Sequence, residues 1–216
     1  MRNEQGGHSF VKSELVIGGQ KSGKSRWAEY RARTWLAQSP QHAAVLIATA
    51  QPGDEEMRLR IARHQADRAQ RVPGMVTVEE PLQLAQAITA HSQPHTLVVV
   101  DCLTLWLTNW LMPSEGHAPQ QAGVTLIAPQ AAVLEEKTPE NAADIAQAAM
   151  LLVAIEQSTG PVVLVGNEIG LGVIPMGADV RAFVDTLGRL NQDVARTCRR
   201  ETLMAAGLPL TLKGIP

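Results

Sequence analysis

The stretch LVIGGQKSGKSRWAEY, residues 15–30, decides the fold of this protein. It joins a hydrophobic run, a glycine-rich turn and an amphipathic helical pattern without a gap. Within it, GGQKSGKS at positions 18–25 matches the pattern G-x-x-x-x-G-K-[ST]. The glycines let the backbone turn tightly so that its N–H groups point at phosphate oxygens, and the following helix adds the positive end of its dipole. Because a strand-like run precedes the turn and a helix follows it, the stretch predicts a nucleotide-binding phosphate loop rather than a plain strand-to-helix connection.

Two side chains of this loop and one distant acid are candidates for catalysis and metal binding. Lys24 is expected to reach the outer phosphates, and the hydroxyl of Ser25 is expected to help hold Mg²⁺. A second acid is expected at the end of another buried strand, where it reaches the metal through water. The run LVVVD supplies Asp101, and a carboxylate seldom follows such an apolar run unless it turns towards something charged. The alternative is a structural role, in which Asp101 caps the next helix.

Apolar runs and helical patterns alternate along the chain. The runs lack polar alternation, as expected for strands covered on both faces, and they lie at 14–19, 43–50, 74–80, 96–104 and 161–168. The helical patterns lie at 25–38, 54–69, 82–91, 141–158 and 178–201. This alternation predicts an α/β fold with a mostly parallel sheet, right-handed crossovers and flanking helices.

Two stretches do not fit this alternation. Residues 113–141 are rich in Pro, Gln and Ala without a clean period, and we expect an insertion or a long surface loop there. Residues 1–13 lack the apolar core of a signal peptide and are expected to be a flexible polar lead-in. Because no repeat or linker divides the rest, residues 14–216 are expected to form a single P-loop nucleotide-binding domain.

Composition narrows the class of protein. A formal net charge of −2 and a pI near 6.3 show no broad basic surface, so we expect neither nucleic-acid nor membrane binding. No apolar stretch reaches the roughly 18 residues of a transmembrane helix. Cys102 and Cys198 lie far apart without metal-ligand spacing, and we expect reduced, buried thiols rather than a disulfide or a zinc site. These features predict a cytoplasmic globular protein.

The stretch PGDEEMRLRIARHQADR, residues 52–68, sets a histidine among arginines. In the expected helix three side chains fall four residues apart on one stripe: Arg60, His64 and Arg68. Arg63 is adjacent to His64 in sequence. Flanking cations disfavour protonation of an imidazole, so His64 is expected to keep a free lone pair while the arginines bind phosphates. Such a histidine could act as a nucleophile on phosphorus.

A plainer interpretation of the same stretch is a solvated helix whose arginines pair with Glu56 and Asp67. From spacing alone this interpretation is favoured, because charge runs are usually exposed faces.

A second glycine-rich segment, VVLVGNEIGLGVIPMGADVR, follows the last buried run. Asn167 and Glu168 come where that strand should end, at the edge where open α/β sheets bind ligands. Each of them could contact substrate or be purely structural. The following loop is shaped by Gly170, Gly172 and Pro175. Asn191 lies on the apolar stripe of the next helix and needs a partner, so we expect it to anchor the loop or a neighbouring subunit.

Taken together, these motifs resemble the bifunctional adenosylcobinamide kinase/adenosylcobinamide-phosphate guanylyltransferase family of cobalamin biosynthesis. The matching pieces are GGQKSGKSRWAE, IAT, DEEMRLRIARH, VVVDCLTLWLTN, VVLVGNEIGLGVIP and GRLNQDVA, in the family's order. The resemblance implies a homotrimeric cytoplasmic enzyme with a RecA-like P-loop sheet. It also implies two reactions: phosphorylation of adenosylcobinamide by GTP or ATP, and transfer of GMP from GTP onto the resulting phosphate.

The resemblance also implies roles for particular residues. The histidine of its R-I-x-x-H motif becomes covalently guanylylated, and here that position is His64, which reverses the preference for a solvated helix. Glu79 is the acid that the resemblance implies as a nucleotide contact. Glu80 competes with it, because the region between Arg68 and Glu79 is longer than expected for the family. The implied nucleotide contacts are Gly18, Gly19, Gln20, Lys21, Ser22, Gly23, Lys24, Ser25, Ala48, Thr49, Ala50, Gln65, Ala66, Asp67, Arg68, Glu79 and Asp101.

Two other functions compete with this one. A P-loop small-molecule kinase without guanylyl transfer would need no nucleophilic histidine. A RecA-like ATPase acting on nucleic acid would need basic loops, which the near-neutral composition does not supply.

Overall fold

The computed structural model describes residues 10–51, 55–112, 139–172 and 175–214, with the side chains of 56, 57, 60 and 139–144 left out of the description. The strands are β1 (Ser13–Gly18), β2 (Ala43–Ala48), β3 (Met75–Glu79), β4 (Thr96–Asp101), β5 (Val162–Val165), β6 (Arg200–Ala205) and β7 (Leu208–Lys213). The helices are α1 (Lys24–Gln38), α2 (Glu55–Arg71), α3 (Leu84–His91), α4 (Leu103–Leu111), α5 (Pro139–Gln157) and α6 (Ala178–Thr197).

One sheet of seven strands, in the order β3-β2-β4-β5-β1-β6-β7, forms the centre of the fold. Neighbouring strands run parallel except for β7, which pairs with β6 in the antiparallel direction. The next strand in the chain, β2, is not a neighbour of β1, since β4 and β5 lie between them. This confirms the predicted α/β fold with a mostly parallel sheet flanked by helices.

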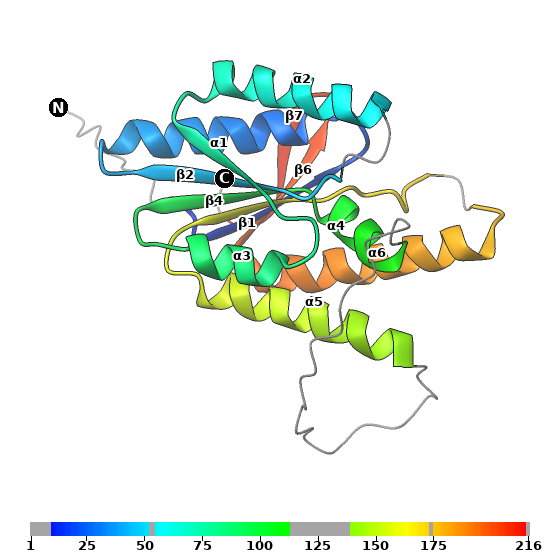
Figure 1. Ribbon diagram of the computed structural model, residues 1–216. Helices are drawn as coiled ribbons and strands as arrows, with labels where there is room; N and C mark the ends of the chain where they lie inside the picture. Colours follow the sequence, from blue (N-terminus) through cyan, green and yellow to red (C-terminus); the bar gives the residue numbers. More distant parts are fainter. Residues whose placement is uncertain (1–9, 52–54, 113–138, 173–174, 215–216) are drawn as a thin grey trace.

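Helices cover both faces of this sheet (Figure 1). Helices α1 and α2 lie on one face, and α3, α5 and α6 lie on the other. Alternate residues of β1 enter two separate apolar clusters, with Leu15 and Ile17 packed towards α3, α5 and α6 and Val16 packed towards α1. Because both faces are covered, the inner strands need apolar side chains at every position, which explains their unbroken apolar runs.

The structure corrects two predicted boundaries. The strand expected at 96–104 ends at Asp101, and the short helix α4 begins at Leu103. That helix is buried through Leu103, Trp106 and Leu107, so its sequence is apolar enough to resemble a strand.

The helix expected at 178–201 ends at Thr197, and its last residues belong to β6. Lys213 caps this end of the helix, because its ammonium donates to the carbonyl oxygens of Ala195, Arg196 and Cys198. The chain then turns back through β6 and β7, whose connection at Ala206 and Gly207 uses positive φ angles of 51° and 82°.

The predicted insertion at 113–141 lies outside the described residues up to 138, and its last three residues begin α5. Of the predicted lead-in at 1–13, residues 1–9 lie outside the description and Ser13 begins β1. Phe10 packs edge-on against Trp35, with ring centroids 5.1 Å apart. Among the described residues, no helix is both long and apolar enough to cross a membrane.

Candidate active site

The phosphate loop connects β1 to α1 at the carboxyl edge of the sheet. Its glycines allow the turn, because Gly18 and Gly23 have φ angles of 151° and 104° and Lys21 also adopts a positive φ of 57°. Lys24 is 7% exposed, and its ammonium donates a 2.7 Å hydrogen bond to the carbonyl oxygen of Gly19. Burial lowers the pKa of Lys24, and the nearby Cys102 and Asp101 oppose that shift. The loop therefore holds a cation against its own backbone, in a position to meet phosphate oxygens.

Inside the loop one polar atom lacks a partner. The hydroxyl of Ser22 is buried and makes no hydrogen bond to any described residue. A buried hydroxyl without a partner is costly, and a bound phosphate oxygen would satisfy it. This observation fits the predicted nucleotide site independently of the sequence motif.

Asp101 and Ser25 meet across the sheet edge. Asp101 ends β4, and its partly buried carboxylate accepts a hydrogen bond from the hydroxyl of Ser25. Burial raises the pKa of Asp101, while this hydrogen bond, the guanidinium of Arg68 and the imidazole of His64 oppose the rise. The helix-cap alternative is not supported, because the N-cap of α4 is Cys102. A hydroxyl and a carboxylate are hard oxygen ligands, so this pair fits the predicted Mg²⁺ site.

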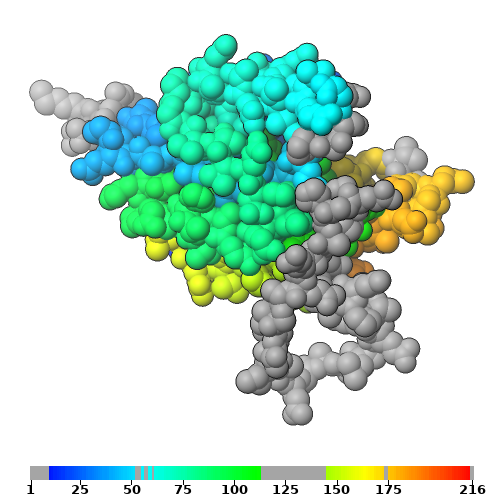
Figure 2. Space-filling view, in the orientation of Figure 1, coloured from blue at the N-terminus to red at the C-terminus, as the bar shows by residue number. Residues whose placement is uncertain are grey.

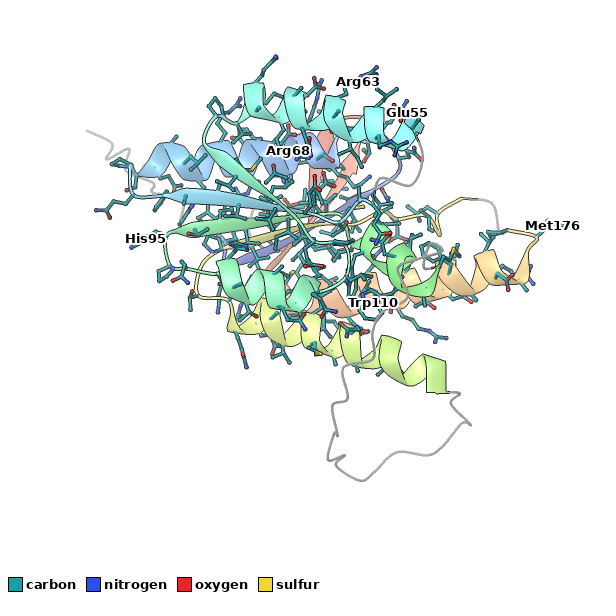
Figure 3. All side chains as sticks on the ribbon, viewed as in Figure 1. Glu55, Arg63, Arg68, His95, Trp110 and Met176 are labelled. Atoms are coloured by element: carbon teal, nitrogen blue, oxygen red, sulfur yellow. The ribbon has the colours of Figure 1, made fainter. Side chains whose placement is uncertain are left out.

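Helix α2 brings the predicted histidine to this edge. His64 is exposed on α2, yet its imidazole is close enough to Asp101 to influence the pKa of that carboxyl. Arg68 is only 8% exposed. In Figure 3 Arg68 points from α2 towards the sheet, and Arg63 points away from the body of the molecule.

A carboxylate on α1 anchors this helix. Glu29, 5% exposed, accepts hydrogen bonds from Arg71 Nε at 2.6 Å and from its Nη2 at 3.1 Å. Its other neighbour is Arg68, whose Nε lies 3.9 Å from Glu29 Oε1. The solvated-helix interpretation is therefore wrong for Arg68, although Asp67 does pair with Arg71 at 3.5 Å, as that interpretation expected for an arginine of this helix. Nothing in the sequence near 52–68 pointed to Glu29.

The structure separates the two acids that competed after β3. Glu79 accepts a 2.9 Å hydrogen bond from Gln65 of α2, so it faces the helix that carries His64. The carboxylate of Glu80 accepts hydrogen bonds from the backbone N–H groups of Leu82 and Gln83, at the beginning of α3. Glu80 thus serves local structure, and Glu79 is the better candidate for a nucleotide contact.

The segment of Ala48, Thr49 and Ala50 lies beside Asp101, as its position at the end of β2 requires. The hydroxyl of Thr49 is fully buried, donates to the carbonyl oxygen of Cys102 at 2.7 Å and accepts from its N–H at 2.8 Å. Asn109 of α4 donates to the carbonyl oxygen of Thr49 at 2.8 Å. These bonds hold the backbone around Asp101, so any nucleotide contact here comes from the segment's shape rather than from the Thr49 hydroxyl.

The second glycine-rich segment starts between β1 and β4. The backbone N–H of Glu168 donates to the carbonyl oxygen of Gly18 at 3.1 Å, and that of Asn167 donates to the hydroxyl of Thr104 at 3.0 Å. The side chain of Asn191 donates to the carbonyl oxygen of Asn167 at 3.0 Å, which confirms its expected role as an anchor of the loop. Thr104 is a contributor that the sequence analysis missed, because only the fold brings it to this edge.

Of the predicted site residues, the structure brings together the phosphate loop, Asp101, His64 and Arg68. Glu79 joins them through Gln65. Ala66 is exposed, and Asp67 is engaged with Arg71. The side chain of Arg60 lies outside the description. The arrangement combines a phosphate loop, a metal-type oxygen pair and a histidine helix at one edge of the sheet.

Known proteins are similar in sequence to this chain over nearly its whole length. Residues 14–212 match the family model described as cobinamide kinase / cobinamide phosphate guanyltransferase. The bifunctional adenosylcobalamin biosynthesis protein CobP of Pseudomonas aeruginosa is 40% identical over 203 residues, covering 94% of this chain and 98% of that protein. The bifunctional adenosylcobalamin biosynthesis protein CobU of Escherichia coli is 32% identical over 199 residues, covering 92% and 98%.

A third relative, the protein of the same name from Salmonella typhimurium, is 32% identical over 200 residues, covering 92% of this chain and 98% of that protein. Among solved structures, the flagellar accessory protein FlaH of Methanocaldococcus jannaschii aligns with a TM-score of 0.48 at 8% identity, over 96% of this chain and 81% of that chain. That likeness is too slight to bear on function. The family model and the curated relatives together show that this chain belongs to the cobinamide kinase / cobinamide phosphate guanyltransferase family.

Proposed function

We propose that the protein phosphorylates adenosylcobinamide with a nucleoside triphosphate and then transfers GMP from GTP to adenosylcobinamide phosphate, giving adenosylcobinamide-GDP. The observation that carries this proposal is that groups suited to two different phosphoryl-transfer reactions lie together at the carboxyl edge of the sheet. The phosphate loop with Asp101 suits transfer of a γ-phosphoryl group, and the exposed His64 beside them suits attack on the α-phosphorus.

In the first reaction the phosphate-loop amides and the ammonium of Lys24 stabilise charge that develops on the γ-phosphoryl group. Lys24 exchanges its bond to the Gly19 carbonyl for bonds to phosphate oxygens. Ser25 and Asp101 would hold Mg²⁺, which neutralises phosphate charge when it is bound. The hydroxyl of Ser22 gains a partner at the same time.

In the second reaction an imidazole nitrogen of His64 attacks the α-phosphorus of GTP. A P–N bond forms, the bond between the α-phosphorus and its bridging oxygen breaks, and pyrophosphate leaves with the electron pair. A phosphate oxygen of the cobinamide phosphate then displaces the histidine and takes GMP. Arg68, held beside Asp101, contributes positive charge for the phosphates, and Glu79 and Gln65 are placed to contact the nucleotide.

The proposal extends to the assembly and location of the enzyme. We propose a homotrimer in the cytoplasm, as the family resemblance implies. Exposed apolar side chains support a subunit contact near the loop before α6, since Leu171 is 78% exposed and Met176 is 96% exposed. Figure 3 shows Met176 at the far tip of that loop.

Labelled GTP tests the central step. Purified protein is incubated with Mg²⁺ and GTP labelled at the α- or the γ-phosphate, and the denatured protein is separated on a gel. We expect acid-labile, alkali-stable label from α-labelled GTP only, and none in His64→Ala. His95→Ala is the matched control and should label like the wild type. His95 directly precedes β4, whose other end carries Asp101, and Figure 3 shows it at that far end of the strand.

Absence of label in a wild-type protein that still binds GTP would leave a plain P-loop kinase or a RecA-like ATPase as the function. Formation of cobinamide phosphate by that same protein would then decide between these two.

A further inference from the structure

One carboxylate at the carboxyl edge of the sheet has no described partner. Glu79 accepts from Gln65, Glu80 accepts from the backbone at the start of α3, and Asp101 accepts from Ser25. By contrast, the carboxylate of Glu168 accepts no hydrogen bond and forms no ion pair within the described part of the chain. An acid left open at the mouth of a nucleotide site is available to a substrate.

The position of Glu168 is set by the sheet. Strand β5 lies between β1, which leads into the phosphate loop, and β4, which ends at Asp101. The chain leaving β5 stays bound to β1, since the N–H groups of Gly166 and Glu168 donate to the carbonyl oxygens of Val16 and Gly18 at 2.9 Å and 3.1 Å. Glu168 therefore sits beside the first residue of the phosphate loop, just past the end of β5 at the carboxyl edge of the sheet.

A groove leads away from Glu168 along α6. Its inner part, about 320 Å³, is lined by Glu168 together with Gly188, Gln192 and Glu201. Burial raises the pKa of Glu201, and the negative charge of Glu168 adds to the rise, so the two carboxylates share this space.

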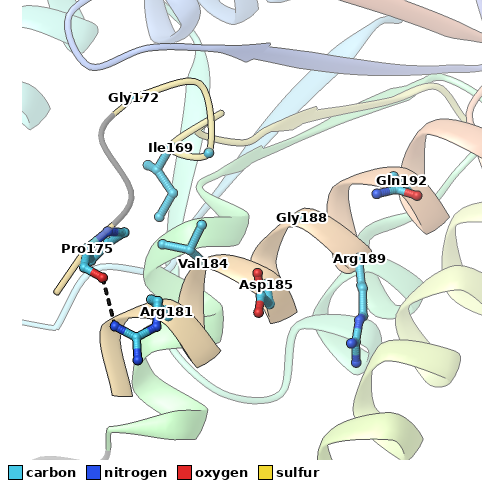
Figure 4. A pocket seen from close by; sticks show the side chains of 10 residues that line it. Ile169, Gly172, Pro175, Arg181, Val184, Asp185, Gly188, Arg189 and Gln192 are labelled. Carbon is cyan, nitrogen blue, oxygen red and sulfur yellow. Dashed lines mark hydrogen bonds between the residues drawn. The ribbon is translucent and has the colours of Figure 1, made fainter. Parts of the chain in front are cut away.

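The outer part of the groove is about 630 Å³ and shares Gly188 and Gln192 with the inner part. Figure 4 shows Ile169 facing Val184 there, with Asp185, Arg189 and Gln192 along the helix. In the space-filling view this end of α6 projects from the right-hand side of the molecule (Figure 2). Apolar contacts flanked by guanidinium and amide groups suit a corrin ring that carries amide side chains.

We infer that Glu168 is the general base of the kinase reaction, and that the groove along α6 delivers the cobinamide hydroxyl to it; this rests on the proposed function. The hydroxyl oxygen attacks the γ-phosphorus and a new P–O bond forms. The bond from the γ-phosphorus to the bridging oxygen breaks, and its electron pair stays on the nucleoside diphosphate. The hydroxyl proton passes to the Glu168 carboxylate, which later releases it to water.

The second reaction has no need of this base. Its nucleophile is a phosphate oxygen that is already ionised near neutral pH, and His64 attacks GTP through a lone pair. Loss of the Glu168 carboxylate should therefore separate the two activities of one protein. A residue that only supports the fold of the phosphate loop would impair both.

Glu168→Gln tests this inference because it keeps the shape of the side chain and the backbone N–H bond to Gly18. Three reactions are measured on each variant: phosphorylation of cobinamide, labelling of His64 by α-labelled GTP, and GMP transfer onto cobinamide phosphate supplied ready-made. We expect kcat for phosphorylation to fall about 10²- to 10⁴-fold with little change in the KM for nucleotide. The other two reactions should stay within about threefold, and Glu168→Asp should recover part of the lost kcat.

The matched control is Glu156→Gln, an exposed glutamate at the end of α5 before β5 begins, and it should leave all three reactions unchanged. Glu201→Gln tests the neighbouring carboxylate. The inference is overturned if Glu168→Gln phosphorylates cobinamide at near the wild-type rate, if it loses all three reactions together, or if Glu201→Gln alone loses phosphorylation. A wild-type protein that makes no cobinamide phosphate would instead refute the proposed function.

Discussion

Replacing Glu29 by Gln should detach the helix that carries His64. Glu29 lies on α1 and is the buried contact point for two arginines of α2, Arg68 and Arg71. Arg71 donates to both carboxylate oxygens, and this hydrogen bonding raises the pKa of Arg71. Glutamine keeps one acceptor but turns an N–H₂ group towards the guanidinium groups, so one of these contacts becomes repulsive.

The expected cost follows from the burial of each partner. The Arg71 side chain is 34% exposed, so solvent screens its pairing, which contributes about 1 kcal/mol. The Arg68 side chain is 9% exposed and its Nε has no hydrogen bond to any described residue, so losing the nearby negative charge costs about 1–3 kcal/mol. Together these changes should lower the free energy of unfolding by about 2–4 kcal/mol.

Urea denaturation of the purified protein measures this loss. With a slope of about 2 kcal/mol per molar urea, the midpoint should fall by about 1–2 M. Labelling of His64 by α-labelled GTP should fall about tenfold or more, because the helix no longer holds its position. Glu55→Gln is the control, since its pairing with Arg58 joins side chains that are 71% and 59% exposed and should contribute under about 0.5 kcal/mol.

Equal denaturation midpoints for Glu29→Gln and Glu55→Gln would refute this reasoning. They would mean that the cost of burying Glu29 and Arg68 cancels the gain from pairing them. Normal labelling of His64 in a destabilised Glu29→Gln protein would show that α2 is held by other contacts.

Two further predictions concern the phosphate loop and the thiols. Gly18→Ala should weaken nucleotide binding tenfold or more and cost about 1–3 kcal/mol of stability, because the added methyl group would lie 2.5 Å from the Met204 carbonyl oxygen. In the control Gly19→Ala the added methyl group meets no atom within 4 Å. An equal loss of stability in both variants, measured by urea denaturation, would contradict the prediction. Burial raises the pKa of Cys102 to about 11 and that of Cys198 to about 12. Above pH 9 the thiols therefore lose their protons in the unfolded chain while they keep them in the folded protein. The free energy of unfolding should fall as the pH rises towards 11. Urea denaturation at pH 8 and pH 10.5 should show a smaller fall in Cys198→Ala than in the wild type, and identical falls would exclude this cause.

Much of the candidate site could be predicted because its signals are local. The phosphate loop is a contiguous motif whose turn, lysine and hydroxyl all lie within 18–25, so no tertiary information is needed to recognise it. Asp101 was recognisable because a carboxylate directly follows a buried apolar run. The second loop was recognisable from its glycines, and Asn191 from its place on an apolar stripe.

Pairings between distant segments could not be predicted. Glu29 binds Arg71 across 42 positions, and nothing in either helix marks the other as its partner. The choice between Glu79 and Glu80 depended on which one faces α2, and the strand period allows either. The helix expected to reach residue 201 ends at Thr197 because the chain becomes extended at Cys198 and joins the sheet as β6, a pairing with the distant β1.

The sequence by itself determined the phosphate loop, the buried strands and the class of fold, because these depend on spacing between near neighbours and on an unbroken apolar character. Only the tertiary structure decided how His64 is presented, which acid faces the nucleotide side, and that Glu168 is left open beside Gly18. Those properties depend on the order of strands in the sheet. That order places β5 between β1 and β4, and the packing of α2 on α1 brings Arg68 to the carboxylate of Glu29. A pattern of residues along the chain contains neither the strand order nor this helix packing.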